Sequence, residues 1–475
     1  MKEPSLRAYQ KNDAKFLASI PCSACFNEQR TGKTPTALEV VKLRRLQDER
    51  VLIVTTASSL YQWKEEYEKW LKKPCVICTG TPTKKLEAIS SWTHGLIVSL
   101  DTFKETASRS GLVDPILKRE PQMVILDEAH KIKNPKSANA KAMFKTSRVP
   151  YRLALTGTPA QGKPYDVFSI LKFLYPNTFR SYWNFIDTYF EIEENVVWQN
   201  GRPRTYKTYD NFKKGMAFQL QDILNGFSTQ RKRKEVMPWL PDKFYQQVKL
   251  EPTKEQKRYL KELEESYRTE DIITTGTLDR LVRYRQICLD PKLLNLKGKS
   301  PKTEWIKQYI KDYPDEQIII FSKFTSYLIE LSKQLDTKWA LLVGATSISQ
   351  RGQFIKDFQA GKFQVFLINI DAGKEALTLD AAETTIFTDK YPPIGSIEQA
   401  EDRFIASTED KAHKAHKIIE LMIADTFDEQ LYTLLEKRKS ETDIINNYKN
   451  YIKERSKTYE RKSTVPVQRS YQGAV

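Results

Sequence analysis

The chain has 475 residues, of which 40% are hydrophobic and 29% charged, a composition that excludes a largely disordered protein and a length that predicts two to four domains. Lys and Arg number 77 against 60 Asp and Glu, a formal net charge of +17, which favours a polyanionic partner such as nucleic acid over a merely soluble basic protein. No apolar run approaches the ~20 residues that cross a bilayer, and residues 1–4 lack the layout of a secretion signal. We therefore expect no membrane partner and a cytoplasmic protein.

Short apolar runs rich in β-branched residues alternate with amphipathic segments along most of the chain. This rhythm is typical of an α/β doubly wound fold with parallel sheets. The first set of strands is predicted at 21–26, 51–54, 76–78, 95–98, 123–126 and 152–155, and the second at 317–321, 340–343, 365–368 and 384–387. The resulting prediction has four parts, namely a first lobe (1–178), a helical and aromatic insertion with a hairpin turn at Asn200-Gly201 (179–297), a second lobe (298–435) and a basic helical tail (436–475).

Five cysteines include two CxxC pairs, Cys22/Cys25 and Cys75/Cys78. Paired CxxC motifs can hold zinc. Here each pair falls on or beside a predicted strand, where alternate side chains point to opposite faces and would be badly placed for one metal. We therefore predict buried free thiols, and the odd Cys288 fits a reducing compartment.

A phosphate-binding loop is predicted at Thr31-Gly32-Lys33-Thr34, between a strand and a helix. In such a loop, backbone N–H groups and the helix N-terminus hold phosphate oxygens, Lys33 reaches the β/γ-phosphates and Thr34 ligates Mg²⁺. The full G-x-x-x-x-G-K-[ST] pattern is not met, because Asn27 stands at the first glycine position. A chance GKT tripeptide in a surface loop is the alternative.

The apolar run Val124–Leu126 ends in two adjacent carboxylates, Asp127 and Glu128. A buried strand that ends in two acids indicates a function for them, with Asp127 in the Mg²⁺ shell and Glu128 polarising the attacking water. An acidic helix cap is the structural alternative. The two motifs in this order predict an ATP- and Mg²⁺-dependent enzyme.

With both motifs in place, residues 5–430 resemble the superfamily 2 helicases, and within them the Swi/Snf-like DNA translocases. The resemblance implies two RecA-like lobes that track along duplex DNA, and it assigns adenine binding near Arg7 and Gln10, coupling to Thr156, Gly157 and Thr158, and catalysis to Gln399 and Arg403 beside the two acids. The segments that carry it are Leu6–Gln10, Ser58–Trp63, Asp127–His130, Leu155–Gln161, Arg231–Val236, Phe321–Phe324, Gly344 with Arg351, and Gln399–Arg403.

The chain departs from the family pattern at several positions. Asn27, Gln29 and Arg30 replace the family's Asp, Met and Gly, and the motif at 372–379 has fewer glycines. The largest departure is Ala406, where the family carries a second arginine that acts as a finger on the transferred phosphoryl group, a contribution of ~10³ or more in rate. Either Arg403 or a nearby lysine serves instead, or the position has been altered, and we expect this chain to bind ATP and hydrolyse it slowly.

Candidate nucleic-acid contacts are Ser58, Ser59 and Thr102 in the first lobe and Ser322, Lys323 and Thr346 in the second. Ordinary loop hydroxyls and a surface lysine are the alternative. Contacts to phosphates carry no sequence code, so we expect little sequence preference and a steep salt dependence. The predicted function is an ATP-dependent duplex-DNA translocase that works as a monomer on forks, junctions or bound proteins, with an ATP-gated clamp or an RNA helicase as alternatives.

Overall fold

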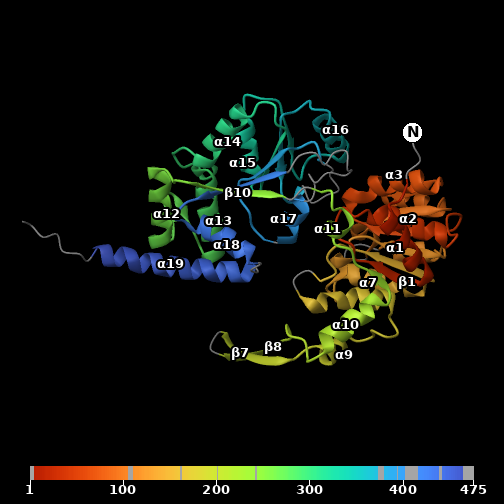
Figure 1. Ribbon diagram of the computed structural model, residues 1–475. Coiled ribbons are helices and arrows are strands. Elements are labelled where there is room, and N and C mark those ends of the chain that lie inside the picture. The colour runs from red at the N-terminus through yellow and green to blue at the C-terminus, as the bar shows by residue number, and fades with distance from the viewer. Residues whose placement is uncertain are drawn as a thin grey trace, which may run out of the picture. The chain divides into compact units, whose positions relative to one another are not determined.

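The computed structural model describes residues 5–104, 111–160, 163–199, 202–240, 243–372, 379–392, 394–401, 416–437 and 441–463. The chain divides into two compact units, Met1–Pro238 and Trp239–Val475 (Figure 1). Each unit contains its own parallel sheet covered by helices on both faces, which confirms the predicted α/β fold class. Over the described ranges, none of the helices has the length and apolar character needed to cross a membrane.

Unit 1 is built on a seven-stranded sheet in which every pairing is parallel, in the order β3-β4-β2-β5-β6-β1-β9. Its strands are β1 (Cys22–Cys25), β2 (Val51–Thr55), β3 (Cys75–Cys78), β4 (Gly95–Ser99), β5 (Met123–Leu126), β6 (Tyr151–Leu155) and β9 (Ser228–Thr229). Its helices are α1 (Ala8–Ser19), α2 (Lys33–Leu43), α3 (Leu60–Leu71), α4 (Pro82–Ser90), α5 (Leu100–Phe103), α6 (Val113–Leu117), α7 (Ala138–Lys145), α8 (Phe168–Leu174), α9 (Tyr182–Tyr189), α10 (Met216–Asn225) and α11 (Arg233–Val236).

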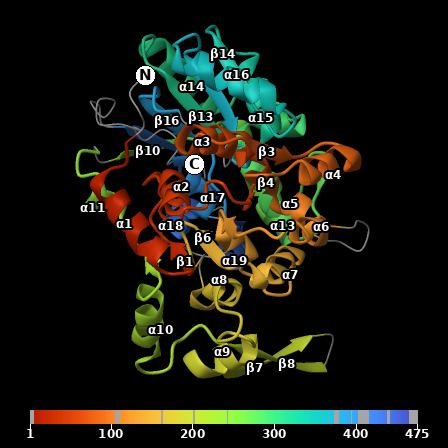
Figure 2. The ribbon, with the colours of Figure 1, turned by 90° about the vertical axis from the view of Figure 1, so that its right-hand side faces the viewer.

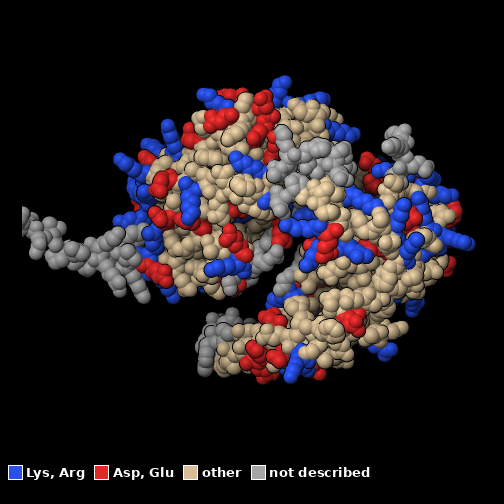
Figure 3. All heavy atoms as spheres, in the orientation of Figure 1, with Lys and Arg blue, Asp and Glu red and all other residues tan. Residues whose placement is uncertain are grey.

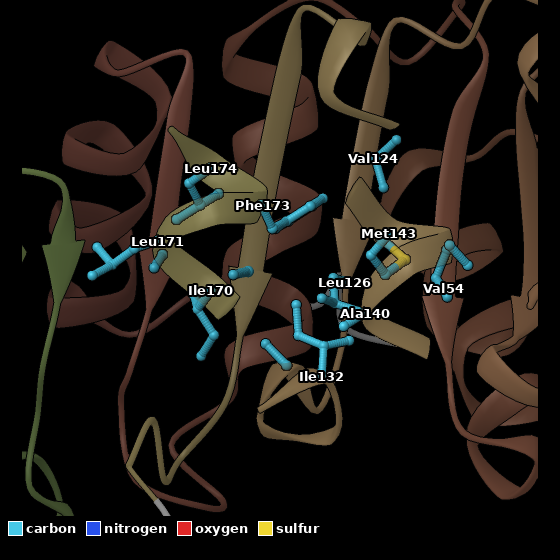
Figure 4. Close-up of a cluster of buried hydrophobic side chains, with 14 of the residues drawn as sticks. Val54, Val124, Leu126, Ile132, Ala140, Met143, Ile170, Leu171, Phe173 and Leu174 are labelled. Carbon is cyan, nitrogen blue, oxygen red and sulfur yellow. The ribbon is translucent and has the colours of Figure 1, made fainter. Parts of the chain in front are cut away.

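Strand alternation divides the core of unit 1 into two layers. In β2, Leu52 and Val54 face one layer while Val51 and Ile53 face the other. Figure 4 shows the first layer, where side chains of α7 and α8 pack onto β2 and β5. Helices α1, α2 and α3 cover the second layer. Because both faces are buried, most residues of these strands are apolar, which allowed the strands to be predicted from the sequence.

The cysteine pairs follow the same alternation. Cys22 and Cys78 lie in the first layer, whereas Cys25 and Cys75 lie in the second. All five cysteines are buried and free of disulfides, and burial raises the pKa of the Cys78 thiol to about 11. Among the described residues no group of three or more His, Cys, Asp or Glu is placed to hold a metal ion, and the prediction of buried free thiols is confirmed.

An antiparallel hairpin of β7 (Glu193–Gln199) and β8 (Arg202–Thr208) extends from unit 1. It groups with α9 and α10 at one end of the unit in both views (Figures 1 and 2). The predicted turn at Asn200-Gly201 lies outside the described residues, but the ladder on both sides of it pairs as a two-residue turn requires.

Unit 2 has a six-stranded parallel sheet in the order β10-β17-β16-β13-β15-β14. Its strands are β10 (Phe244–Leu250), β13 (Ile318–Ser322), β14 (Trp339–Leu342), β15 (Val365–Asn369), β16 (Thr384–Phe387) and β17 (Lys417–Ile423), with a small hairpin of β11 (Arg268–Thr269) and β12 (Ile272–Ile273). Its helices are α12 (Lys254–Ser266), α13 (Thr277–Leu289), α14 (Pro301–Asp312), α15 (Thr325–Ser332), α16 (Ile348–Gln359), α17 (Ile394–Glu401), α18 (Phe427–Glu436) and α19 (Glu441–Ser463).

The division into units differs from the four expected segments. Segment 179–297 is shared, because β9 extends the sheet of unit 1 while β10 forms an edge of the sheet of unit 2. The basic tail is also integrated, since Ile444, Tyr448 and Ile452 of α19 are buried in the core of unit 2. Each of these pieces buries apolar or backbone groups against a lobe, so it folds as part of that lobe.

Candidate nucleotide-binding site and nucleic-acid contacts

The phosphate loop of unit 1 turns at Gly32, which caps α2 with a left-handed backbone, φ 76°. A Cβ at this position would lie 2.1 Å from Nε2 of Gln10. Gln10 Nε2 and the hydroxyl of Tyr9 both donate to the carbonyl of Thr31, at 3.1 and 2.7 Å, and Gln10 Oε1 accepts from the backbone N–H of Arg7 at 2.8 Å. The predicted adenine segment is therefore bonded directly to the predicted phosphate loop.

Lys33 begins α2, and its ammonium donates to the carbonyls of Asn27 and Glu28 at 3.0 and 3.1 Å. Asn27 and Glu28 belong to the segment between β1 and α2. Backbone carbonyls are neutral acceptors, so an anion that enters the loop can compete for the Lys33 ammonium without breaking an ion pair. This is the arrangement expected of a lysine that binds phosphate.

Asp127 follows β5 and has two side-chain donors on one oxygen. Thr55 Oγ1 and Trp63 Nε1 each donate to Asp127 Oδ2 at 2.8 Å, and the backbone N–H of Glu128 donates to Oδ1 at 3.0 Å. Burial, followed by the neighbouring charge of Glu128, raises the pKa of Asp127. A half-buried carboxylate with a raised pKa and fixed orientation is a common feature of a functional site, and the acidic-cap alternative does not require these donors.

Glu128 has a left-handed backbone, φ 49°, which is uncommon for a residue other than glycine and marks strain at functional sites. Its carboxylate lies 3.2 Å from Nδ1 of His130, and the same nitrogen lies 3.1 Å from the hydroxyl of Thr156. That hydroxyl accepts from the backbone N–H of Thr158 at 3.2 Å. A Cβ at Gly157 would lie 3.1 Å from the backbone N of Gln29. The predicted coupling motif thus connects to Glu128 through His130 and approaches the phosphate loop closely at Gly157.

The donor set of this region fits a magnesium nucleotide. Mg²⁺ in phosphoryl-transfer sites takes one or two protein oxygens and completes its shell with phosphates and water. Asp127 and the hydroxyl of Thr34, in the first turn of α2, are the residues that would hold it, with Lys33 and the Gly32 turn on the phosphates. The sequence analysis did not name Thr55, Trp63 or His130 as site residues, although Trp63 and His130 lie in motifs that the resemblance identified.

The segment that leads out of unit 1 is hydrogen-bonded alongside the phosphate loop. The carbonyls of Phe227, Thr229 and Arg231 accept from the backbone N–H groups of Ala24, Phe26 and Glu28. The sequence analysis identified Arg231–Lys234 as a basic segment between the lobes but did not predict this contact. A strand of two residues carries no periodic signal, so β9 could not be recognised in the sequence.

The three candidate nucleic-acid contacts of unit 1 lie at the carboxyl edge of the sheet. Ser58 and Ser59 follow β2 and Thr102 follows β4, and these two strands are neighbours in the sheet. The hydroxyls of Ser58 and Ser59 both lie 2.9 Å from that of Thr56, and the hydroxyl of Thr102 accepts from Ser99 at 3.0 Å. All three are half-buried and follow neighbouring strands of the sheet.

The three candidate nucleic-acid contacts of unit 2 differ in how far they are buried. Ser322 is fully buried and its hydroxyl donates to Asp389 at 2.6 Å, so we omit it from the proposed phosphate contacts. The ammonium of Lys323 pairs with Asp371 at 2.7 Å, and the hydroxyl of Thr346 accepts from the backbone N–H of Val343 at 3.0 Å. Lys323 and Thr346 are half-buried and retain access to solvent.

Asp389 organises the loop that carries Lys323. Besides Ser322 it accepts from the backbone N–H of Lys323 at 3.1 Å and from Arg285 of α13 at 2.9 Å. On the face shown in Figure 3, Lys and Arg are spread over the described parts of both units with Asp and Glu between them. The net charge of +17 is therefore not concentrated in one patch of that face.

The last motif falls largely outside the described residues. Arg403 and Ala406 lie there, as does the motif at 373–378, and Gln399 is placed by the backbone of α17 alone. The end of this helix is anchored through Glu401, whose carboxylate pairs with Lys390 at 2.9 Å and accepts from Tyr245 at 2.8 Å.

Comparison with known proteins gives a consistent family. Residues 9–293 match the SNF2-related domain and residues 301–405 the helicase conserved C-terminal domain. The human "DNA annealing helicase and endonuclease ZRANB3" is 25% identical over 79% of this chain and 34% of its own length. The zebrafish "Chromodomain-helicase-DNA-binding protein 1-like" is 24% identical over 93% and 44%, and an ATP-dependent helicase of Mycoplasma pneumoniae is 27% identical over 88% and 40%.

Among solved structures, the Sulfolobus solfataricus SWI2/SNF2 ATPase core in complex with dsDNA is 21% identical, with 92% of this chain and 91% of that chain covered and a TM-score of 0.41. The chain spans less than half the length of the curated relatives named above. The SNF2-related match alone covers more than half of the 475 residues. The chain belongs to the SNF2-related family.

Proposed function

We propose that the chain is an ATP-dependent motor that translocates along duplex DNA and remodels forks or junctions, or displaces bound proteins. The observation that carries the proposal is the continuous set of contacts from the phosphate loop through Gly157, Thr156 and His130 to Glu128. A motor needs its catalytic acid to respond to the occupancy of the loop, and a simple nucleotide-binding protein does not. Family membership and the names of the relatives support the same activity.

We assign the following roles to the residues of the nucleotide site. Lys33, Thr34 and the Gly32 turn would hold the triphosphate, and Thr34 with Asp127 would hold Mg²⁺. When bound, magnesium ATP supplies a phosphoryl group whose transfer to water releases free energy. Glu128 orients the attacking water, and His130 keeps its carboxylate beside Thr156. Arg7 and Gln10 bind the adenine side, and Gln399 and Arg403 act from unit 2.

Ser58, Ser59, Thr102, Lys323 and Thr346 are the proposed contacts to DNA phosphates. Hydroxyls and a lysine fix a strand by its backbone and do not distinguish bases. We further propose that the chain works as a monomer in the cytoplasm of a bacterium or a phage-infected cell, where duplex DNA is directly accessible.

ATPase rates with duplex, forked, four-way and single-stranded DNA and with RNA test this proposal. We expect stimulation by duplex or branched DNA above that by single strands or RNA, and a steep loss of binding between low and moderate salt. Lys33→Ala is the matched negative control. Stimulation by RNA above duplex DNA, or affinity that does not change with salt, would contradict a DNA translocase.

A second candidate is an ATP-gated nucleic-acid clamp with little hydrolysis, which Ala406 favours because the family's second arginine is missing from the sequence. Single-turnover hydrolysis in the presence of duplex DNA separates the two. A translocase releases phosphate on the time scale of DNA dissociation or faster, whereas a clamp retains ATP throughout.

A further inference from the structure

Asp13 is a buried carboxylate of α1 that lies beneath the phosphate loop and is 1% exposed. Its two oxygens bind two different segments. Asn27 Nδ2 donates to Asp13 Oδ2 at 2.8 Å, while Arg231 donates to Oδ1 through Nη2 and Nε at 2.8 and 3.1 Å. A buried carboxylate is costly unless its oxygens are paired, and here both are used.

Both partners lead to Lys33. The backbone carbonyl of Asn27 accepts from the Lys33 ammonium at 3.0 Å, and the carbonyl of Glu28 accepts from it at 3.1 Å. Glu28 is held in turn by Arg231, because its backbone N–H donates to the Arg231 carbonyl at 3.0 Å. Each Asp13 oxygen therefore braces one of the two residues whose carbonyls receive Lys33.

The contact between positions 13 and 27 joins one carboxylate and one amide. Position 27 holds Asn where the resembling family carries Asp, and the buried negative charge comes from Asp13 instead. At a separation of 2.8 Å two carboxylates cannot both be ionised, so one acid and one amide is the combination that this contact accepts. The amide of Asn27 supplies the donor that an aspartate would lack, and its own Oδ1 has no hydrogen-bond partner in the described structure.

We infer that Asp13 is a positioning residue of the nucleotide site, whose carboxylate holds Asn27 and Arg231 and so sets the two carbonyls that place Lys33. The inference rests on the proposed function to the extent that the loop binds ATP. It requires that the acid and the amide can exchange positions between residues 13 and 27 without loss of MgATP binding, as long as one acid and one amide are present.

Four chains test the exchange, namely the wild type, Asp13→Asn, Asn27→Asp and the double variant that carries both changes. Calorimetric titration with MgATP measures the dissociation constant, and thermal unfolding is recorded on the same samples. Each single variant should weaken MgATP binding about tenfold. Asp13→Asn leaves one acceptor oxygen for the two donors, the Asn27 amide and Arg231, whereas Asn27→Asp places two acids in contact. The double variant, with the acid at position 27, should return to within about threefold of the wild type.

Two further variants separate positioning from stability. Arg231→Gln alters a side chain that is 44% exposed, so the chain should still fold, and it should weaken MgATP binding by a factor that does not add to that of Asp13→Asn. Asp428→Asn removes another buried acid, whose partner Lys302 lies 2.7 Å away in unit 2. It should lower the unfolding temperature without changing the dissociation constant for MgATP.

The inference is overturned if the double variant binds MgATP no better than the weaker single variant, or if both single variants bind like the wild type. If a single variant fails to fold, the double variant and Arg231→Gln still decide between these outcomes. A wild-type chain that binds no MgATP would refute the proposed function and the inference together, whereas wild-type binding without rescue refutes the inference alone.

Discussion

The turn at Gly32 gives the sharpest stability prediction, because the chain offers a matched control at Gly215. Both glycines have a left-handed backbone, with φ of 76° and 80°. An added Cβ at Gly32 would meet Gln10 Nε2 at 2.1 Å, whereas at Gly215 it would meet nothing within 4 Å. Gly215→Ala therefore measures the backbone cost alone, and Gly32→Ala measures the same cost together with a clash.

The magnitudes follow from these two terms. A left-handed conformation costs an L-residue about 1–2 kcal/mol, which is the whole expected effect of Gly215→Ala. In Gly32→Ala the amide of Gln10 must also move away from the carbonyl of Thr31, which removes a hydrogen bond of about 0.5–1.5 kcal/mol. We expect a total near 3 kcal/mol, or roughly 6–12 °C in the unfolding temperature of a unit of this size.

Urea unfolding of both alanine variants, of Gln10→Ala and of the double variant Gly32→Ala/Gln10→Ala checks this reasoning. The double variant no longer contains the clash, so its loss of stability should be smaller than the sum of the two single losses by about 1 kcal/mol. MgATP affinity should fall in Gly32→Ala and stay unchanged in Gly215→Ala. Equal destabilisation by the two glycine variants would refute the role of Gln10 as the neighbour that requires glycine.

Three other predictions concern separate parts of the chain. Thr55→Val removes one of the two side-chain donors to Asp127 Oδ2, a hydrogen bond to a charged group of about 1.5–3 kcal/mol. It should raise the Mg²⁺ concentration for half-maximal ATPase about tenfold or more, and an unchanged Mg²⁺ concentration would contradict this role. Burial lowers the pKa of His416 to about 3, below the ~6.5 of a histidine in an unfolded chain. Neutral His416 therefore adds stability in full above pH ~6.5, and this contribution is lost between pH ~6.5 and 3 because the unfolded chain takes up a proton there first. At pH 5 this loss is about 2 kcal/mol, and His416→Gln should show a smaller drop in urea stability between pH 7 and 5 than the wild type. Ala406→Arg should raise DNA-stimulated turnover by ~10³, and normal turnover in the wild type with no gain in the variant would rule out the finger explanation.

The features that the sequence predicted correctly are those with a local signal. Ten strands, including β2 at Val51–Thr55 and β15 at Val365–Asn369, lie where uninterrupted apolar runs predicted them. Burial on both faces gives this signal in the sequence because most residues of such a strand have apolar side chains. The opposite facing of Cys22 and Cys25 followed from strand geometry in the same way.

The missed strands lack such a signal or were overlooked. In β10 half-buried residues alternate with exposed ones and none is buried, and the strand lies at the edge of its sheet. Its partner β17, Lys417–Ile423, is mostly apolar and buried along nearly its whole length, so it carries the local signal but was not among the predicted strands. Because β10 was not predicted, the boundary between the units at 238 falls inside the separate segment that was predicted at 179–297.

The contacts that organise the nucleotide site could not be predicted from spacing. Arg231 and Asp13 are 218 residues apart, and His130 and Thr156 belong to two motifs whose contact only the fold establishes. Motifs indicate which side chains do the chemistry, since their residue types are required by the reaction. The residues that hold them in place come from distant parts of the chain, and a pairing such as that of the Asn27 amide with the Asp13 carboxylate is visible only when both side chains are seen in contact.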